Sequence, residues 1–128
     1  MPDITVLGFD WGAKRIGTAV GNSLTRSATP LRTVRGERTA ARFDAIAALI
    51  REWQPQQLVV GLPLHPDGAE HDNTAHARRF ARQLHGRFHL PVALVDERYT
   101  SAVAQADGAA DVDCAAACLI VEQYLQQL

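Results

Sequence analysis

Four carboxylates of this chain occupy places from which a folded protein could bring them together. Asp10 ends an apolar stretch, Asp96 and Glu97 end another, and Asp113 opens an alanine-rich stretch with helical spacing. A carboxylate at the end of a central strand is held by a rigid element and faces the loops where ligands arrive. Asp10 is therefore the first candidate for chemistry, although Asp and Gly are also ordinary turn formers.

Carboxylates gathered from distant parts of a chain repel one another unless cations lie between them. Mg²⁺ or Mn²⁺ suits such a cluster, because these ions prefer oxygen ligands and retain several waters. Two such ions can activate a water and stabilise the leaving oxygen in phosphodiester hydrolysis. Taken singly, Asp113 could instead offset a helix macrodipole and Glu97 could pair with Arg98. Neither alternative accounts for acids at the ends of strands.

The composition is that of an ordinary globular protein. The 128 residues predict a single domain, residues 1–128, with 47% hydrophobic and 21% charged residues. No apolar run approaches the roughly 18 to 20 residues of a membrane span, and no signal segment is recognisable at the N-terminus. We therefore expect a cytoplasmic protein without membrane contact. The two cysteines, Cys114 and Cys118, match no metal spacing and are expected to pack as small residues.

Positive charge is unevenly distributed along the chain. Twelve of the thirteen cations are arginine, all thirteen precede Tyr99, and the formal net charge is -1. The planar guanidinium suits phosphate and carboxylate partners better than an ammonium does. The cluster Arg78, Arg79 and Arg82 is expected mainly in solvent, with phosphate contact as the less favoured alternative.

Apolar spacing predicts the elements that position the acids. Strands are expected at residues 4–10, 16–20 and 29–34, followed by strands at 58–61 and 91–95. The first three, joined by short links, predict an antiparallel meander. Helices are expected at 39–53, 73–88 and 112–128, with a shorter one at 99–106. This order describes an α/β protein with a mixed five-stranded sheet, three antiparallel strands first, and helices on both faces.

The first predicted helix has one apolar face. Apolar side chains from Phe43 to Trp53 recur at three- and four-residue spacing, so this face is expected to be buried. Arg42, Arg51 and Glu52 fall mainly on the other face and are expected in solvent.

The sequence alone does not decide the roles of Trp11 and of the histidines. Trp11 follows Asp10 and either stacks on a base or packs against the sheet edge. The histidines form no zinc motif, and surface or loop positions are expected for all five: His65, His71, His76, His85 and His89.

Four motifs in order resemble the YqgF/RuvX family over nearly the whole chain. They are FDWGAKRIG at 9–17, VGLPL at 60–64 with DG at 67–68, VDER at 95–98, and VDCAA at 112–116. The family is described as pre-16S rRNA nucleases and, earlier, as Holliday junction resolvases. The resemblance implies a ribonuclease H-like fold and a metal-dependent nuclease acting in processing of the 5′ end of pre-16S rRNA.

The resemblance also implies roles for particular residues. Asp10, Glu97 and Asp113 look like the family's catalytic and metal-binding acids, holding Mg²⁺ or Mn²⁺. The loop at 61–68 looks like a substrate-side loop. Lys14, Arg15 and Arg98 look like basic neighbours suited to the substrate phosphates. His65 is a further candidate for substrate binding, because it lies in the loop at 61–68.

One segment departs from the family pattern. Family members usually have a longer, often basic segment before the last helix, whereas residues 99–112 here are few and carry no Lys or Arg. A neutral segment contributes no counterion release, so weaker nucleic-acid binding or a different substrate choice is expected.

Three other functions compete with an RNA nuclease. A Holliday junction resolvase cuts two strands symmetrically and acts as a dimer, whereas this sequence shows no obvious apolar patch for self-association. We therefore expect a monomer or weak homodimer. Together with the family description, this favours RNA over DNA junctions, and the resemblance implies ribosomal precursor particles as partners. A sugar kinase or actin-like ATPase would need two such domains. A non-catalytic RNA-binding ribosome-assembly factor remains a third alternative.

Overall fold

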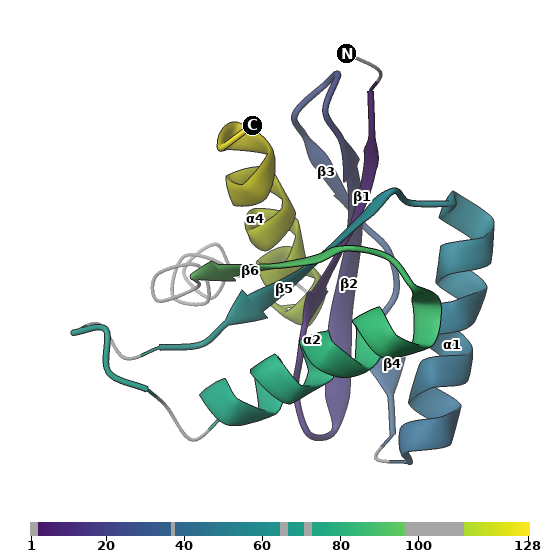
Figure 1. Cartoon of the computed structure of the whole chain (residues 1–128), viewed down its shortest axis with the longest axis vertical. Helices are drawn as coiled ribbons and strands as arrows, with labels where there is room; N and C mark the ends of the chain where they lie inside the picture. Colours follow the sequence, from purple (N-terminus) through teal and green to yellow (C-terminus); the bar gives the residue numbers. More distant parts are fainter. Residues whose placement is uncertain (1–2, 37, 65–66, 71–72, 97–111) are drawn as a thin grey trace.

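The structure is a computed structural model in which a mixed sheet lies between two helical layers (Figure 1). It describes residues 3–36, 38–64, 67–70, 73–96 and 112–128, without the side chains of Val112 and Asp113. The predicted helix at 99–106 falls outside the described residues. Among the described residues, no helix is long and apolar enough to cross a membrane.

The sheet has six strands in the order β3-β2-β1-β5-β6, with β4 also paired to β2. β1 is antiparallel to β2 and parallel to β5, and β5 is parallel to β6. The mixed sheet with an antiparallel beginning is therefore confirmed. The strands are β1 (Thr5–Asp10), β2 (Arg15–Asn22), β3 (Ala28–Pro30), β4 (Val34–Arg35), β5 (Gln57–Leu62) and β6 (Val92–Asp96).

The prediction of one third strand at 29–34, and hence of five strands, is wrong. That segment forms two short strands, because the register against β2 changes by one residue between the pairs Ala19–Pro30 and Ile16–Val34. The intervening backbone is held by a backbone hydrogen bond from the N–H of Leu31 to the carbonyl of Thr18 at 3.0 Å and by the Thr18 side chain. The hydroxyl of Thr18 donates to the carbonyl of Arg32 and accepts from its N–H at 3.2 Å. Such a local bulge bends an edge strand without ending its pairing.

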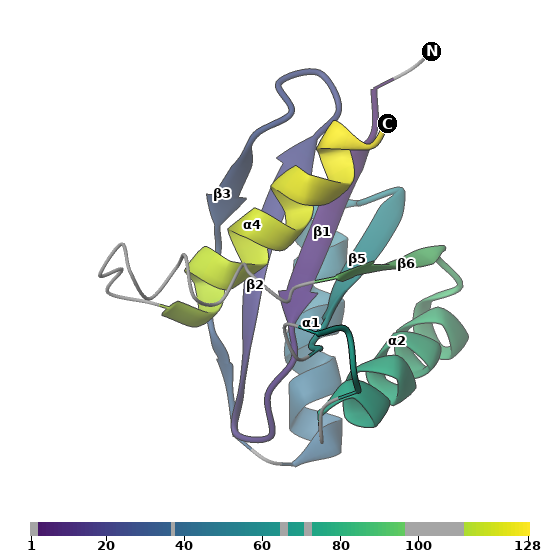
Figure 2. The ribbon, with the colours of Figure 1, turned by 90° about the vertical axis from the view of Figure 1, so that its left-hand side faces the viewer.

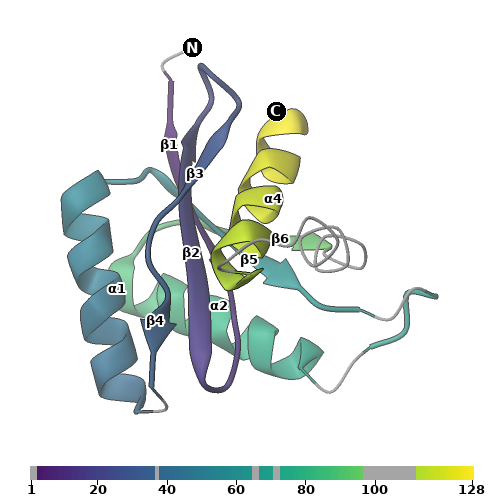
Figure 3. The same ribbon diagram turned by 180° about the vertical axis from the view of Figure 1, so that it is seen from behind.

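Helices cover both faces of the sheet, as predicted (Figure 3). They are α1 (Thr39–Trp53), α2 (Thr74–Phe88) and α4 (Val112–Gln126), each within two residues of its predicted bounds. One core lies beneath α1 and α2 and includes Phe9 and Phe80. A second core lies beneath α4 and includes Val6 and Val95. The two cores follow from strand alternation, since successive side chains point to opposite faces.

Two predictions for the faces of α1 are wrong. Arg42 is buried instead of solvated, whereas Trp53 is 39% exposed although it was placed on the buried face. Trp53 is the last residue of α1 and lies at the rim of the core. Arg42 contacts a loop from another part of the chain, described below with the site.

A glycine allows α4 to approach β1 closely. A Cβ at Gly8 would lie 2.2 Å from the Cγ2 atom of Val121 and 3.6 Å from the carbonyl oxygen of Ala117. Figure 2 shows α4 crossing the face of β1 and β2. Small residues on both sides of this contact therefore set the distance between the helix and the sheet.

The cysteines of α4 pack as small residues, as predicted. Cys114 is buried, and Cys118 is half-buried against the core beneath the helix. Burial raises the pKa of the Cys118 thiol to about 11, and the neighbouring Glu122 and Cys114 add to the rise. The Cys118 thiol is thus neutral at physiological pH and lacks the thiolate form that binds metals.

Gly8→Ala tests the close contact with α4. The added methyl group must displace Val121, and overpacking of this kind costs about 1 to 3 kcal/mol. We expect a lower urea midpoint, measured by circular dichroism, with partial recovery in Gly8→Ala/Val121→Ala. Gly86→Ala is the matched control, because no described atom apart from its chain neighbours and the backbone of its own helix lies within 4 Å of the place its new methyl group would take. That helical substitution should be neutral or stabilising, and an equal loss in both variants would contradict the argument.

Candidate functional site at the ends of the parallel strands

Asp10 lies at the carboxyl end of β1, the central strand of the sheet. β5 and β6 run parallel to β1, so the three strands end at the same edge. Phe9, Val60 and Leu94 form the row of paired residues just before that edge. The half-buried Asp10 comes one residue later and pairs with Gly17 of β2. The strand-end placement predicted for Asp10 is confirmed.

Strand alternation separates Asp10 from Asp96. Phe9 packs beneath α1 and α2, so the next residue, Asp10, belongs to the face that carries α4. Val95 packs into the core beneath α4, so Asp96 belongs to the opposite face. β5 lies between their strands, which puts the two backbones roughly 10 Å apart. Asp96 is therefore a poor partner for Asp10 in a shared cation site.

The beginning of α4 points toward the Asp10 end of the sheet. Ala117 and Val121 of α4 lie over Gly8, while Val121 and Leu125 lie over Gly21, which pairs with Val6 nearer the start of β1. The helix thus runs opposite to β1. Asp113 precedes Ala117 by about one helical turn, and Asp10 follows Gly8 by two residues. Asp113 and Asp10 therefore both lie toward the carboxyl end of β1, relative to the contact between Ala117 and Gly8.

A side-chain contact fixes the first turn of α4. The Sγ atom of Cys114 and the Oγ1 atom of Thr33 are 3.4 Å apart. Thr33 immediately precedes β4, whose Val34 pairs with Ile16. The first turn of α4 therefore lies near the part of β2 that pairs with the end of β1.

The other residues predicted for the site are described only in part. Lys14 and Arg15 are exposed, at the end of the β1–β2 loop and the beginning of β2. Asp113 belongs to the first turn of α4, without a described side chain. Within the described part of the chain, no three His, Cys, Asp or Glu side chains form a metal-binding group. The predicted residues outside it are Glu97, Arg98 and His65.

Arg42 fastens the loop that follows Asp10. Its Nη2 atom donates to the carbonyl oxygen of Gly12 at 2.7 Å, and its Nη1 atom donates to that of Ala13 at 2.9 Å. The N–H of Gly36 donates to the carbonyl of Lys14 at 3.0 Å on the other side of the loop. Burial lowers the pKa of the Arg42 guanidinium below its ordinary value. A buried cation that satisfies two carbonyls holds this loop in one conformation.

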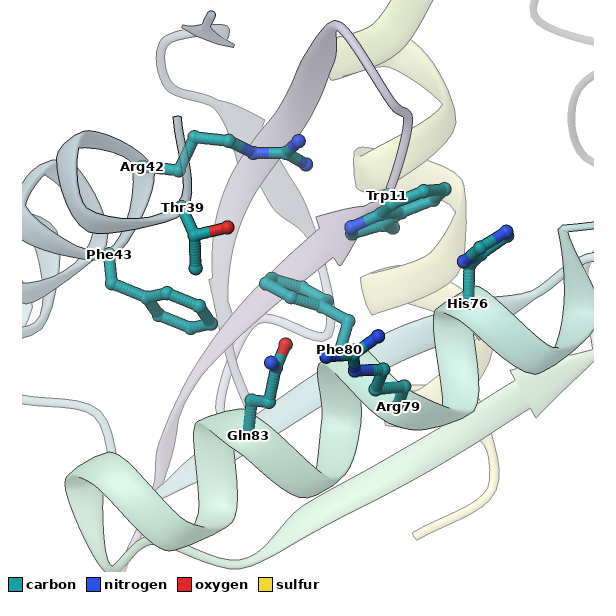
Figure 4. A pocket seen from close by; sticks show the side chains of 8 residues that line it. All are labelled: Trp11, Thr39, Arg42, Phe43, His76, Arg79, Phe80 and Gln83. Atoms are coloured by element: carbon teal, nitrogen blue, oxygen red, sulfur yellow. The ribbon is translucent and has the colours of Figure 1, made fainter. Parts of the chain in front are cut away.

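Trp11 is packed instead of extending into solvent. The Arg42 guanidinium carbon lies 5.5 Å from the centre of its ring, and the His76 ring stacks on it at 5.3 Å with an interplanar angle of 14°. Figure 4 shows Arg42 and His76 on either side of Trp11. His76 lies on α2, so this contact joins the loop after Asp10 to the second helix.

The order and directions of the strands, with helices on both faces, define a ribonuclease H-like fold. The fowlpox virus Holliday junction resolvase has a TM-score of 0.62 at 11% identity, covering 98% of this chain and 100% of that chain. T. thermophilus RuvC in complex with a Holliday junction substrate has a TM-score of 0.56 at 15% identity, covering 97% and 94%. At these identities the likeness concerns the fold alone.

The chain belongs to the RuvX family, described as "RuvX: Holliday junction resolvase", which matches residues 4–127. A relative from Polynucleobacter necessarius is 54% identical over 127 residues, covering 98% of this chain and 86% of the relative. One from Albidiferax ferrireducens is 57% identical over 124 residues, covering 97% and 79%. Both carry the name "Putative pre-16S rRNA nuclease". The resemblance to this family is confirmed, and membership makes the chain a nuclease, a hydrolase of phosphodiester bonds.

Arg42→Met tests whether the buried guanidinium stabilises the loop. The substitution keeps much of the side-chain volume but leaves the Gly12 and Ala13 carbonyls without their donor, so unfolding free energy should fall by about 1 to 3 kcal/mol. Urea titration measures the change. The matched control is Arg51→Met, an exposed arginine on the same helix, which should stay within about 0.5 kcal/mol of wild type. An equal loss of unfolding free energy in both variants would show that the hydrogen bonds from Arg42 to Gly12 and Ala13 do not stabilise the loop.

Proposed function

We propose that this protein is a divalent-metal-dependent ribonuclease that processes the 5′ end of pre-16S rRNA. The observation that carries the proposal is the position of Asp10, half-buried at the carboxyl end of the central strand and on the face covered by α4. The name of the relatives that are 54% and 57% identical supports this choice of RNA.

The proposed metal site combines Asp10 with Glu97 and Asp113. Asp10 fits a hard cation, because an anionic oxygen donor on a rigid strand is the type of ligand that Mg²⁺ and Mn²⁺ prefer. Glu97 comes two residues after Val95, whose side chain faces the core beneath α4. Asp113 belongs to the first turn of α4, at the end of the helix directed toward the Asp10 edge. The position of Asp10 and the direction of α4 support a shared site, to which the sequence adds Glu97.

Bound divalent ions would supply an activated water and charge stabilisation for the leaving oxygen. The chain's own groups would hold and orient the reactants. Asp10 provides a fixed carboxylate, and the loop fastened by Arg42 presents Lys14 and Arg15 toward solvent beside it. We propose that these two cations, together with Arg98 and His65, bind phosphates of the substrate strand.

The proposed setting is that of ribosome production in bacteria. The substrate would be a ribosomal precursor particle or its free RNA, met in the cytoplasm by a monomer or weak homodimer. A Holliday junction resolvase is the second candidate, favoured by the fold likeness to the fowlpox virus resolvase. Symmetric cutting of a junction requires two active sites related by two-fold symmetry, which makes dimerisation a condition of that alternative.

Asp10→Asn tests the proposed metal site. The substitution removes a negative charge but keeps the shape, so cleavage of a labelled precursor rRNA 5′ leader should fall about 100-fold or more. Cleavage by wild type should require Mg²⁺ or Mn²⁺ and stop with EDTA. The measurement is the initial rate on a sequencing gel, with a synthetic four-way DNA junction assayed in parallel.

Asp44→Asn is the matched control, because Asp44 is an exposed carboxylate on α1. Its cleavage rate should equal that of wild type. Cleavage that survives Asp10→Asn would contradict the site, and symmetric cutting of the junction alone would establish the resolvase instead. Binding of the leader without any cutting would identify an RNA-binding assembly factor.

Lys14→Gln and Arg15→Gln test the phosphate contacts. Each phosphate contact contributes counterion release, so each substitution should weaken RNA binding and lower the slope of log K against log salt by about 0.7 to 1. Filter binding at several salt concentrations measures the slope, in an Asp10→Asn background that prevents cutting. Arg26→Gln is the control, since this exposed arginine lies in the turn after β2, at the other end of that strand. An equal change in all three slopes would indicate nonspecific attraction only.

A further inference from the structure

A cavity of about 150 Å³ opens beside the loop that follows Asp10, between the first parts of α1 and α2. Figure 4 shows its lining, to which the loop and both helices contribute. At roughly 30 Å³ per water molecule, the cavity has the volume of about five waters. It is large enough for a small planar group. The residues of its lining that matter here are Trp11, Phe43, Phe80, Arg42, Arg79 and Gln83.

The apolar part of the lining is aromatic and is held in place by packing. The ring of Phe80 lies 5.9 Å from that of Phe43 and 5.7 Å from that of Phe9, which is fully buried in β1. Trp11 is held by the contacts with Arg42 and His76. A ligand therefore meets preformed walls, which lowers the ordering cost of binding.

Polar groups at the cavity favour a ligand rich in hydrogen-bond acceptors. Two guanidinium groups line it, from Arg42 and Arg79, and the amide of Gln83 projects toward the same space (Figure 4). Among the described residues, no carboxylate belongs to the lining. Arg42 already gives hydrogen bonds to Gly12 and Ala13, whereas Arg79 is exposed at the rim. Aromatic walls with arginine and amide donors are suited to a nucleobase, which offers a flat face and carbonyl or ring-nitrogen acceptors.

The cavity adjoins the proposed catalytic edge. Trp11 follows Asp10 directly, so their Cα atoms are about 3.8 Å apart. The Asp10 side chain belongs to the face of α4, while the cavity lies on the face of α1 and α2. A strand whose phosphate is held at Asp10 can therefore pass over the end of β1 and place a neighbouring base on the other side.

We propose that this cavity binds one unpaired nucleobase of the substrate strand, next to the phosphate on which Asp10 acts. The base must be unpaired, because a base stacked inside a helix cannot enter a pocket. The identity of the substrate rests on the proposed function, but the binding of a nucleobase can be measured without any cleavage. The site would favour substrates with a single-stranded nucleotide beside the cleavage point.

Tryptophan fluorescence provides the test, because Trp11 and Trp53 are the only two tryptophans of the chain. In a Trp53→Phe background, Trp11 alone reports on the cavity. We expect UMP and AMP to change its emission in the millimolar range, with inorganic phosphate having a much smaller effect. Arg79→Ala should weaken nucleotide binding about tenfold, as for loss of a charged hydrogen bond. Arg82→Ala, an exposed arginine one helical turn away that does not line this cavity, should change it less than twofold.

Three outcomes would overturn the proposal. The first is an unchanged emission up to saturating nucleotide, the second is an equal response to inorganic phosphate, and the third is equal weakening by Arg79→Ala and Arg82→Ala. A second measurement uses RNA leaders with one abasic nucleotide, bound by the Asp10→Asn variant. Removal of one base beside the cleavage point should weaken binding, and this effect should disappear in Arg79→Ala. If the wild-type protein cleaves no RNA but Trp11 still responds to nucleotides, the proposed function is rejected and the nucleobase site is retained.

Discussion

The close packing of α4 on β1 is the constraint on which this structure depends. Gly8 has no side chain, so Val121 and the Ala117 backbone can lie directly on the central strand. This contact closes the second core, in which Val6, Val59 and Ile120 are fully buried. It also fixes the direction of the helix, whose first turn extends toward the end of β1. A bulkier residue at position 8 would move both the core and the start of α4.

The opposite face holds the loop after Asp10 by different means. There the contacts are polar and aromatic: Arg42 donates to two loop carbonyls, and His76 stacks on Trp11. Hydrogen bonds to a charged donor fix direction as well as distance. The loop is therefore held from α1 and α2, while Asp10 itself belongs to the face of α4. The end of β1 is supported by all three helices that the structure describes.

Local patterns in the sequence were sufficient for the features that depend on local physics. The apolar spacing of α2 and its flanking residues located it at residues 73–88, one residue from the observed Thr74–Phe88. The apolar run before Asp10 located this acid at a strand end, because alternation and an acid-glycine turn are short-range signals. Glu97 was identified in the same way, as an acid at a predicted strand end, and the family motifs added Arg98 and the loop that contains His65; the placement of these three residues stays a prediction.

The errors have a different physical origin. Helical periodicity predicts which face of α1 carries Arg42, but it cannot show that the β1–β2 loop packs against that face. The buried role of Arg42 depends on carbonyls thirty and twenty-nine residues earlier. Where the third strand divides, the contacts are likewise distant in sequence, because the Thr18 hydroxyl bonds to the backbone of Arg32 fourteen residues later. No local sequence signal distinguishes either residue from a solvated arginine or an ordinary strand threonine.

The two sites proposed at the end of β1 lie on opposite faces of the sheet, which bears on how the protein would select its substrate. In the proposed site Asp10 would act through charge, and a phosphate is the same in every nucleotide, so this face would carry no sequence or shape information. Information must come from groups that contact a base or require a particular strand geometry. The loop fastened by Arg42 lies between the two faces, and its residues Trp11 and Lys14 turn in different directions, one packed and one exposed. In the proposed complex, a rigid loop at this point would couple the position of the phosphate at Asp10 to that of the neighbouring base, which a mobile loop could not do.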